Sequence, residues 1–434
     1  MQHKTNVADF YIFKLIAMWR HFKTEHFGFK LICGYLFFEF TRLQSIFPVL
    51  DILPWPRLCL IGALIGALAD PSVKWATSAA NKWMYLFLLG VIASVITANY
   101  PETAREHFID FFIWFIIYFL IINIVNTKER LYIFLCIFIF AAAKIAIGTS
   151  KNWAMSGFAF RKEGLMGPAG SFQNSGELAI LMLTLFPLPF LIQRATGIVK
   201  ARWEQILLTL FWVAPIMTII GASSRGSQLA LAAQLLIIFR KSAFKLKSLL
   251  TGIVIIAAIV ALMPQAQLDR LSNSGKDDSS LQRLLYWERG REMIWDNPVF
   301  GVGFYNFAPY FQTHHSADLL TKEAQLPHNI FIQVGTDGGI PLIVYLVALI
   351  AFCLTTAVRL AKDDTINPIN RAIAAGLGYG VLGFALAGQF VTVTYYPFLW
   401  VHLAMLVSLN NISRRDKLLT MKTTTLNTGK SSTR

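Results

Sequence analysis

Three sets of side chains in this sequence have the types and spacing that chemistry on an anionic substrate requires. Arg225 stands between two apolar stretches that have almost no linker between them. Arg283, Trp287 and Arg291 recur every four residues, so a helix would place them on one face. His328 opens a further apolar stretch. Guanidinium groups bind phosphate oxygens well, and a neutral imidazole can act as a general base near neutral pH.

Ser224 and Arg225 indicate an anion-binding helix N-terminus. The positive end of a helix dipole disfavours a cation, so an arginine at this position is electrostatically unusual. A bound anion would be held jointly by backbone N–H groups, hydroxyl groups and the guanidinium group. The alternative is an arginine whose side chain extends along apolar surface to the membrane interface.

The segment LQRLLYWERGREMIWDN, residues 281–297, predicts a helix that stops before Pro298. Two arginines around a tryptophan suit a glycan diphosphate, with guanidinium groups on the phosphates and the indole on a sugar ring. Alternatively, Glu288 and Glu292 neutralise the arginines. The same segment predicts an apolar helix side that rests on the remainder of the protein, formed by Leu281, Leu284, Leu285 and Ile294.

The segment FAFRKEGLMGPAGSFQNSGELA predicts a glycine-rich loop whose backbone can fold closely around a ligand. Arg161 and Asn174 would then form part of a diphosphate clamp, with Asn174 as a hydrogen-bond donor or as the cap of the next helix. The alternative is a solvated loop whose charged side chains pair with one another.

His328 is the first candidate for a general base, and Asn329 follows it at the start of the apolar helix IFIQVGTDGGIPLIV. The alternative is a histidine that only caps this helix or is satisfied in the core. Glu163 and Asp337 are rival candidates for the base.

His314, His315 and Asp318 are the residues that most resemble a metal site. Adjacent histidines on one loop, without a further ligand at a recognisable spacing, are poor evidence for such a site. We therefore expect no metal and no cofactor.

The composition predicts a membrane protein. Of the 434 residues, 55% are hydrophobic and 15% are charged, whereas soluble domains carry about 25% charged residues. The net charge of +15 would suit nucleic acid, but the basic residues fall between apolar segments and in the tails, so we expect no nucleic-acid partner. All four cysteines lie in apolar runs, which predicts buried thiols.

An all-α polytopic fold with about twelve transmembrane helices follows from the apolar segments. The residues 9–19 could instead lie in the membrane interface. We expect an N-terminal transmembrane bundle over 1–263 with an outer loop at 149–175, a large outer loop over 264–339, C-terminal transmembrane helices over 340–410 and a basic tail over 411–434. Helices are predicted near 27–41, 54–69, 83–99, 107–126, 130–148, 176–193, 204–221, 225–239, 247–263, 340–358, 371–390 and 394–410.

The distribution of Lys and Arg predicts the orientation of the chain. The basic clusters within residues 4–30, 240–247 and 414–422 fall on one side of a twelve-span protein, so this side and both termini should be cytoplasmic. The other side then receives Arg161, Arg225, Arg283, Arg291 and His328. Cations on the outer side suggest an anionic ligand. The predicted outer loops are 42–53, 100–106, 149–175, 221–224, 264–339 and 391–393.

The order of these motifs resembles the bacterial O-antigen ligases and related polysaccharide polymerases. The resemblance rests on the early segment YLFFEFTRLQSIFPVLDILPW and on Ser224-Arg225-Gly226, Arg283-x3-Trp287, Asp296-Asn297-Pro298-x2-Gly301-x-Gly303, His328-Asn329 and Asp337-Gly338-Gly339. The last motif departs from the Glu-Leu-Gly that is common in the family, which puts a role for that carboxylate in doubt.

The resemblance implies a GT-C-like fold and a metal-independent, inverting transfer of a glycan from undecaprenyl diphosphate on the periplasmic face of the inner membrane. The acceptor would be lipid A–core in a ligase or another glycan in a polymerase. His328 would be the base, and Arg161, Arg225, Arg283 and, less securely, Arg291 would bind the diphosphate. Ser224, Trp287, Asn174 and Asn329 would support them. The competing class is a transporter of lipid-linked oligosaccharides, which more often shows internal repeats and midplane charges.

Overall fold

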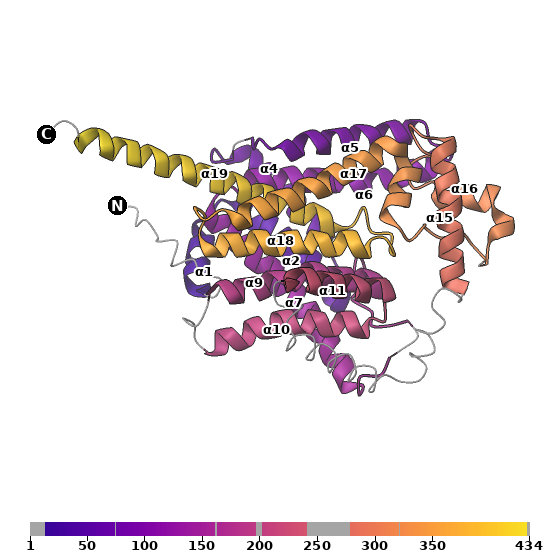
Figure 1. Cartoon of the computed structure of the whole chain (residues 1–434), viewed down its shortest axis with the longest axis horizontal. Helices are drawn as coiled ribbons and strands as arrows, with labels where there is room; N and C mark the ends of the chain where they lie inside the picture. The colour runs from indigo at the N-terminus through magenta and orange to yellow at the C-terminus, as the bar shows by residue number, and fades with distance from the viewer. Residues whose placement is uncertain are drawn as a thin grey trace.

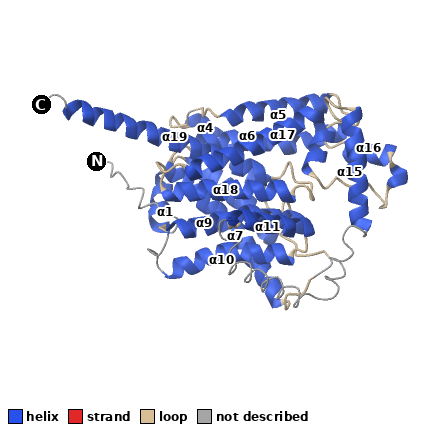
Figure 2. Ribbon diagram, in the orientation of Figure 1, coloured by secondary structure: helices blue, strands red, loops and turns tan. Residues whose placement is uncertain are grey.

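The computed structural model describes residues 14–73, 75–160, 163–196, 202–240, 278–320 and 322–431. In this part of the chain all regular secondary structure is helical, without a strand (Figure 2). The predicted helix 247–263, the beginning of the predicted loop at 264–277 and Arg161 lie outside the described residues.

The helices follow the apolar segments closely. Every helix predicted outside 247–263 has a counterpart, so the prediction of an all-α polytopic membrane protein is confirmed. The bounds differ most for 130–148, 340–358 and 394–410, because α7 continues to Met155, α17 begins at Ile330 and α19 continues through the predicted basic tail to Ser431. The helices are α1 (Leu15–Thr24), α2 (Phe27–Thr41), α3 (Leu43–Ile46), η2 (Pro48–Leu50), α4 (Trp55–Ala69), α5 (Ala79–Ile96), α6 (Pro101–Ile124), α7 (Lys128–Met155), α8 (Ser175–Leu185), α9 (Pro187–Thr196), α10 (Arg202–Gly221), α11 (Arg225–Ile238), α15 (Asp278–Asp296), α16 (Phe307–His314), η4 (Ser316–Asp318), α17 (Ile330–Lys362), α18 (Pro368–Ala387) and α19 (Pro397–Ser431).

Among the described residues, eight helical stretches are long and apolar enough to cross a membrane, if η2–α4 and α8–α9 each count as one. Helices α2, α11 and α19 run alongside them in the bundle (Figure 1). Helix α8 lies at its centre, because every residue from Glu177 to Leu185 is buried. A helix that is apolar on all sides requires such a position.

The loops predicted on the outer side gather at one end of the bundle, here called the α15 end (Figure 1). Backbone hydrogen bonds join Asn99 to Val302 (3.1 Å) and Leu165 to Gly221 (3.3 Å). The opposite end, called the α1 end, joins the other loops through an ion pair between Lys128 and Asp416 at 2.5 Å. These contacts agree with the predicted grouping of the loops that they join, and the assignment of the two ends to the two sides of a membrane stays a prediction.

Helix α17 is interrupted where the sequence reads Gly338-Gly339. Neither glycine has helical dihedrals, and Gly339 has a φ of 70°. A β-carbon on Gly339 would lie 2.4 Å from the carbonyl oxygen of Pro298, so only glycine fits. The predicted span 340–358 begins at this break. Residues 330–337, which we assigned to the outer loop, form the first turns of α17.

Helix α15 lies across the ends of the bundle helices (Figure 1). The prediction of its buried side is only partly correct: Ile294 is buried, but Leu281 and Leu284 are exposed. The helix instead buries Tyr286 and Met293 in a small apolar cluster of its own, because α16 and the turn before it cover that face. The cluster consists of Tyr286, Met293, Val302, Phe307 and Phe311.

Candidate functional site

A cavity of about 620 Å³ opens at the α15 end, between the N-termini of α8 and α11, the helix α15 and the segments 325–328 and 390–392. It brings together residues from regions far apart in the sequence. Five of the predicted site residues line it: Asn174, Ser224, Arg225, Arg283 and His328.

Arg225 is the first residue of α11, and Ser224 is the N-cap. The preceding Ser223 has a left-handed φ of 56°, which turns the chain sharply between α10 and α11. The Nη2 atom of Arg225 donates to the Oγ of Ser280 at 3.2 Å, so the guanidinium group connects α11 to α15. A β-carbon on Gly226 would lie 2.5 Å from the side chain of Phe390. The Ser-Arg-Gly motif therefore allows α11 to approach the 390–392 segment.

Arg283 and Trp287 have different positions relative to the cavity. Arg283 lines it, whereas Trp287 lies one turn further along α15. The indole N–H of Trp287 donates to the backbone carbonyl of Pro327 at 2.9 Å, and its ring centroid is 6.2 Å from that of Phe390. In this structure, Trp287 therefore holds the residue before His328.

Arg291 is exposed and does not line the cavity. Four residues of an α-helix rotate by about 400°, so each step from 283 to 287 to 291 turns the side chain about 40° further round the axis. Arg283 consequently faces the cavity while Arg291 faces away from it. The prediction that Arg283, Trp287 and Arg291 share one helix face therefore holds only approximately.

His328 has a left-handed φ of 51°, and its N–H donates to the Oγ1 of Thr392 at 2.7 Å. Its Nε2 atom lies 3.3 Å from the Oε1 of Gln325. Burial, with a smaller contribution from the charge of Arg283, lowers the pKa of His328 to about 4. The imidazole is therefore neutral at pH 7 and can accept a proton.

Asn329, and not His328, caps α17. Its Oδ1 accepts hydrogen bonds from the N–H groups of Phe331 (2.9 Å) and Ile332 (3.2 Å). An N-cap asparagine is a common solution for the unpaired donors of a first helical turn. The side chain of His328 is consequently left to the cavity, and the interpretation of His328 as the helix cap is wrong.

The two rival bases have different environments. Glu163 lines the same cavity as His328. Asp337 does not: it is 1% exposed and accepts hydrogen bonds from the backbone N–H of Tyr305 at 3.0 Å and from the hydroxyl of Tyr395 at 2.8 Å. Asp337 holds the break in α17 against two neighbouring segments.

Glu177 and Tyr396 also line the cavity, and neither was predicted from the sequence as a site residue. The Oε1 of Glu177 accepts hydrogen bonds from the Tyr396 hydroxyl and from the side-chain amide of Asn174, each at 3.1 Å, and Oε2 accepts the Asn174 backbone N–H at 3.1 Å. The pattern Asn-x-x-Glu is the signature of a capping box and could have revealed Glu177. No local sequence pattern predicts Tyr396, because it contacts Glu177 from a segment more than 200 residues further along the chain.

Asp318 accepts a hydrogen bond from the Nε of Arg289 at 2.7 Å, and the ring of His314 lies 4.3 Å from that of Tyr310. The ring of His315 lies 5.4 Å from that of Phe311. Across the described ranges, no group of three or more His, Cys, Asp or Glu side chains is arranged to hold a metal ion.

Residues 209–347 match the family model described as O-Antigen ligase. This segment extends from α10 into α17 and contains Arg225, Arg283 and His328. A comparison with curated proteins gives no significant match.

Proposed function

We propose that the chain is a membrane glycosyltransferase of the ligase type, because residues 209–347 match the family model described as O-Antigen ligase. It moves a glycan from undecaprenyl diphosphate to an acceptor hydroxyl, of the lipid A–core type, at the α15 end, which faces the periplasm of a bacterial inner membrane. The observation that carries this proposal is the convergence of Arg225, Arg283 and His328 on one cavity from three separate elements.

In the proposed reaction His328 takes the proton of the acceptor hydroxyl, and the oxygen attacks the anomeric carbon of the donor sugar. The bond between this carbon and the diphosphate oxygen breaks, and its electron pair leaves with the diphosphate. Attack opposite the leaving group inverts the anomeric configuration. Arg225 and Arg283 stabilise the negative charge that develops on the diphosphate, which is work that a metal ion does in other transferases.

The low pKa of His328 is compatible with this role. Before the donor binds, burial and Arg283 keep the imidazole neutral at pH 7. A diphosphate bound next to the ring would favour the imidazolium form, because an opposite charge within about 4–6 Å stabilises a cation. Binding of the donor would thus strengthen the base at the stage when it has to accept a proton.

The lining of the cavity also suits a lipid carrier. Phe160, Leu326, Phe390 and Val391 give it an apolar side next to the two arginines. A polyprenyl diphosphate has the same division between an apolar chain and a charged head. Arg161, adjacent to Phe160 in the sequence, remains a further proposed ligand of the diphosphate.

A polymerase would use the same donor chemistry, and only its acceptor would be a glycan. A transporter is less well supported, because a transporter binds its substrate near the membrane midplane. The cavity with Arg225 and Arg283 instead lies at the loop end of the bundle, beside α15.

The test uses the purified full chain, an undecaprenyl diphosphate-linked glycan and two acceptors: lipid A–core and a second lipid-linked glycan. His328→Ala and Arg225→Ala should each reduce transfer by at least about a hundredfold, the usual range for a general base or an oxyanion-stabilising group. His314→Ala and Arg105→Ala are matched controls, because both side chains are exposed and outside the cavity. Normal transfer by both site variants would overturn the proposal, and the preferred acceptor separates ligase from polymerase.

A further inference from the structure

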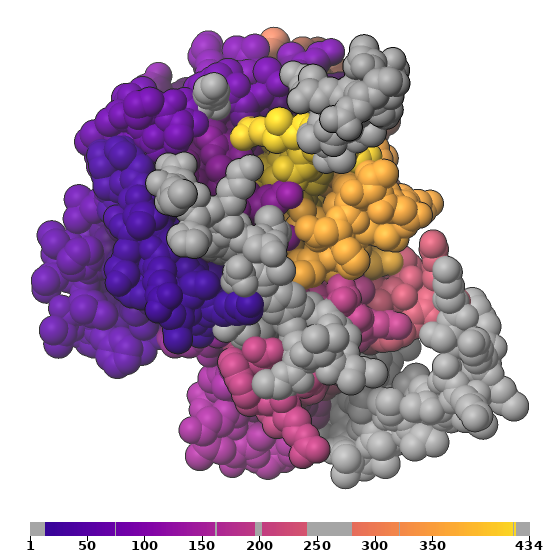
Figure 3. All heavy atoms as spheres, turned by 90° about the vertical axis from the view of Figure 1, so that its left-hand side faces the viewer, coloured from indigo at the N-terminus to yellow at the C-terminus, as the bar shows by residue number. Residues whose placement is uncertain are grey.

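A second cavity, of about 840 Å³, lies at the opposite, α1 end of the bundle. It is bounded by α1, the segment before α5, the connection between α6 and α7, and the part of α19 that leaves the bundle. Figure 3 looks onto this end, where purple segments from the first third of the chain lie beside the yellow C-terminal helix. The α19 residues in its lining recur at intervals of three or four and thus form one stripe: Ser408, Asn411, Arg414, Arg415 and Leu418.

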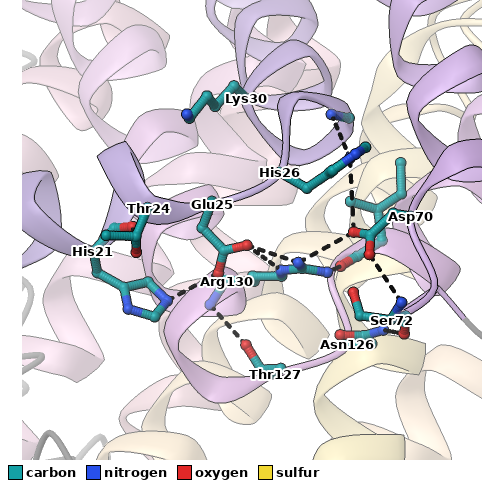
Figure 4. Close-up of polar contacts among 12 residues, drawn as sticks. His21, Thr24, Glu25, His26, Lys30, Asp70, Ser72, Asn126, Thr127 and Arg130 are labelled. Atoms are coloured by element: carbon teal, nitrogen blue, oxygen red, sulfur yellow. Dashed lines mark hydrogen bonds and ion pairs between the residues drawn. The ribbon is translucent and has the colours of Figure 1, made fainter. Parts of the chain in front are cut away.

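One wall of this cavity is fixed by a buried ion-pair cluster (Figure 4). The Nη2 of Arg130 lies 2.7 Å from Glu25 and 3.4 Å from Asp70, and its Nη1 donates to the carbonyl of Ile124 at 3.0 Å. These contacts join α7 to the α1–α2 connection and to the end of α4. Because Arg130 is paired with Glu25 and Asp70, its guanidinium group is not available to a ligand, and the cluster supplies a rigid wall.

The cavity also contains charged side chains of both signs that have no ion pair within the described ranges. Among the described residues, neither Glu129 nor Arg414 has an ion-pair partner, and Arg415 donates to the backbone carbonyl of Asn126 at 3.2 Å. The neighbouring Lys128 and Asp416 pair with each other at 2.5 Å. A carboxylate and two guanidinium groups thus line one cavity without being joined.

A buried hydroxyl lies at the inner part of the same stripe. Ser408 is 1% exposed, and its Oγ has no hydrogen-bond partner in the part of the chain that the structure describes. Unsatisfied buried polar atoms are rare and often mark a place where a ligand or water binds. Two apolar residues of the lining are accessible from outside, since Trp75 is 71% and Leu418 61% exposed.

We propose that this cavity binds the headgroup of a zwitterionic, amine-bearing phospholipid from the membrane leaflet at the α1 end. Arg414 and Arg415 bind the lipid phosphate, Glu129 accepts hydrogen bonds from the primary ammonium group, and the acyl chains lie over Trp75 and Leu418. A purely anionic headgroup would offer no cation to the carboxylate of Glu129. A quaternary ammonium headgroup could not donate to the carboxylate.

The site is independent of the proposed glycan transfer, since it lies at the other end of the bundle and shares no lining residue with the first cavity. Its position suits a lipid headgroup: basic pockets between helices bind such groups near the membrane surface, and tryptophan favours that depth.

The proposal is tested by binding of three phospholipids with identical acyl chains to the delipidated full chain in detergent. The headgroups are ethanolamine, choline and glycerol. The wild-type protein should bind phosphatidylethanolamine more tightly than the other two. The double change Arg414→Gln and Arg415→Gln should weaken this binding by at least about tenfold, because it removes two charge-assisted contacts to phosphate. The single change Glu129→Gln should abolish the preference for ethanolamine over glycerol.

Arg20→Gln is the matched control for general attraction between an arginine and lipid phosphate, because Arg20 is exposed on α1 and does not line the cavity. Soluble phosphoethanolamine should compete only weakly, since it lacks acyl chains. Equal binding of the three lipids would overturn the proposal, as would equal losses in the control and the double variant. Competition by phosphoethanolamine as strong as that by the lipid would show a site for the free headgroup and would also contradict it. If the double variant fails to fold, the headgroup preference of the Glu129 variant decides.

Discussion

The indole N–H of Trp287 donates to the backbone carbonyl of Pro327 at 2.9 Å, immediately before His328. This hydrogen bond joins α15 to the strained segment that carries the proposed base. On the other side of His328, its own N–H donates to Thr392. The backbone around the imidazole is thus held from two directions, and the helix that presents Arg283 to the cavity also positions His328.

Trp287→Phe should therefore lower the rate of transfer without weakening donor binding. Phenylalanine keeps an aromatic ring against Phe390 but cannot donate to Pro327. We expect a loss of about tenfold in kcat, which corresponds to one hydrogen bond worth about 1.4 kcal/mol, with little change in KM for the lipid-linked donor. Trp295→Phe is the matched control on the same helix, because Trp295 is exposed. An equal loss in both variants would argue against a positioning role.

The pH dependence of transfer should report His328. Its pKa of about 4 means that the imidazole is deprotonated above pH 4, so kcat/KM should fall only as the pH drops through that value. Burial is the main cause and remains in Arg283→Gln, whereas the charge of Arg283 is removed. The acid limb of that variant should consequently move to higher pH. An unchanged acid limb would show that Arg283 does not act on the base.

The same shift has a consequence for stability. The folded-state pKa of His328 lies below the ordinary histidine value of 6.5. The unfolded chain therefore binds this proton more tightly, and the free energy of unfolding should decrease as the pH falls from about 6.5 towards 4. His328→Gln should remove this part of the decrease, which thermal unfolding at a series of pH values would measure. If the melting temperature of His328→Gln depended on pH in the same way as that of the wild-type protein, the predicted contribution of His328 would be contradicted.

Arg225→Lys should retain the charge at the N-terminus of α11 but lose the planar guanidinium group, which donates to Ser280 and is the proposed ligand of the donor phosphates. Arginine and lysine are not equivalent where several directed hydrogen bonds are made. We expect KM for the donor to rise by about tenfold, from one lost charge-assisted contact. Arg105→Lys provides the control, since Arg105 is exposed and outside the cavity. An unchanged KM would show that charge alone suffices at this position.

Substitutions at Asp337 test whether this carboxylate stabilises the fold or takes part in catalysis. Asp337→Leu would leave the N–H of Tyr305 and the hydroxyl of Tyr395 without their acceptor, at about 1–3 kcal/mol for each buried group. The melting temperature should fall clearly. Asp337→Asn keeps one acceptor oxygen and should melt closer to the wild-type protein while retaining most of the transfer activity. Loss of transfer in a well-folded Asp337→Asn would revive Asp337 as the base.

The sequence alone could predict the helices because their signals are local. Apolar runs of the right length predicted helices such as α4, α5 and α18 to within a few residues, and the stop before Pro298 predicted the end of α15. The sequence also predicts how the loops are divided between two ends, since each spanning helix reverses the side of the chain. The resemblance to the O-antigen ligases likewise rests on the order of motifs along the chain.

The cavities depended on tertiary structure, because their walls come from segments hundreds of residues apart. The spacing in the sequence predicted that Arg283 and Arg291 both face the site, but successive residues rotate around the axis of α15 and only Arg283 lines the cavity. The role of Asn329 as the cap that leaves His328 to the site also appeared only in the folded chain, as did Tyr396 and Thr392. Local propensity determines which residues form a helix, whereas the packing of one helix against another decides which side of it reaches a ligand.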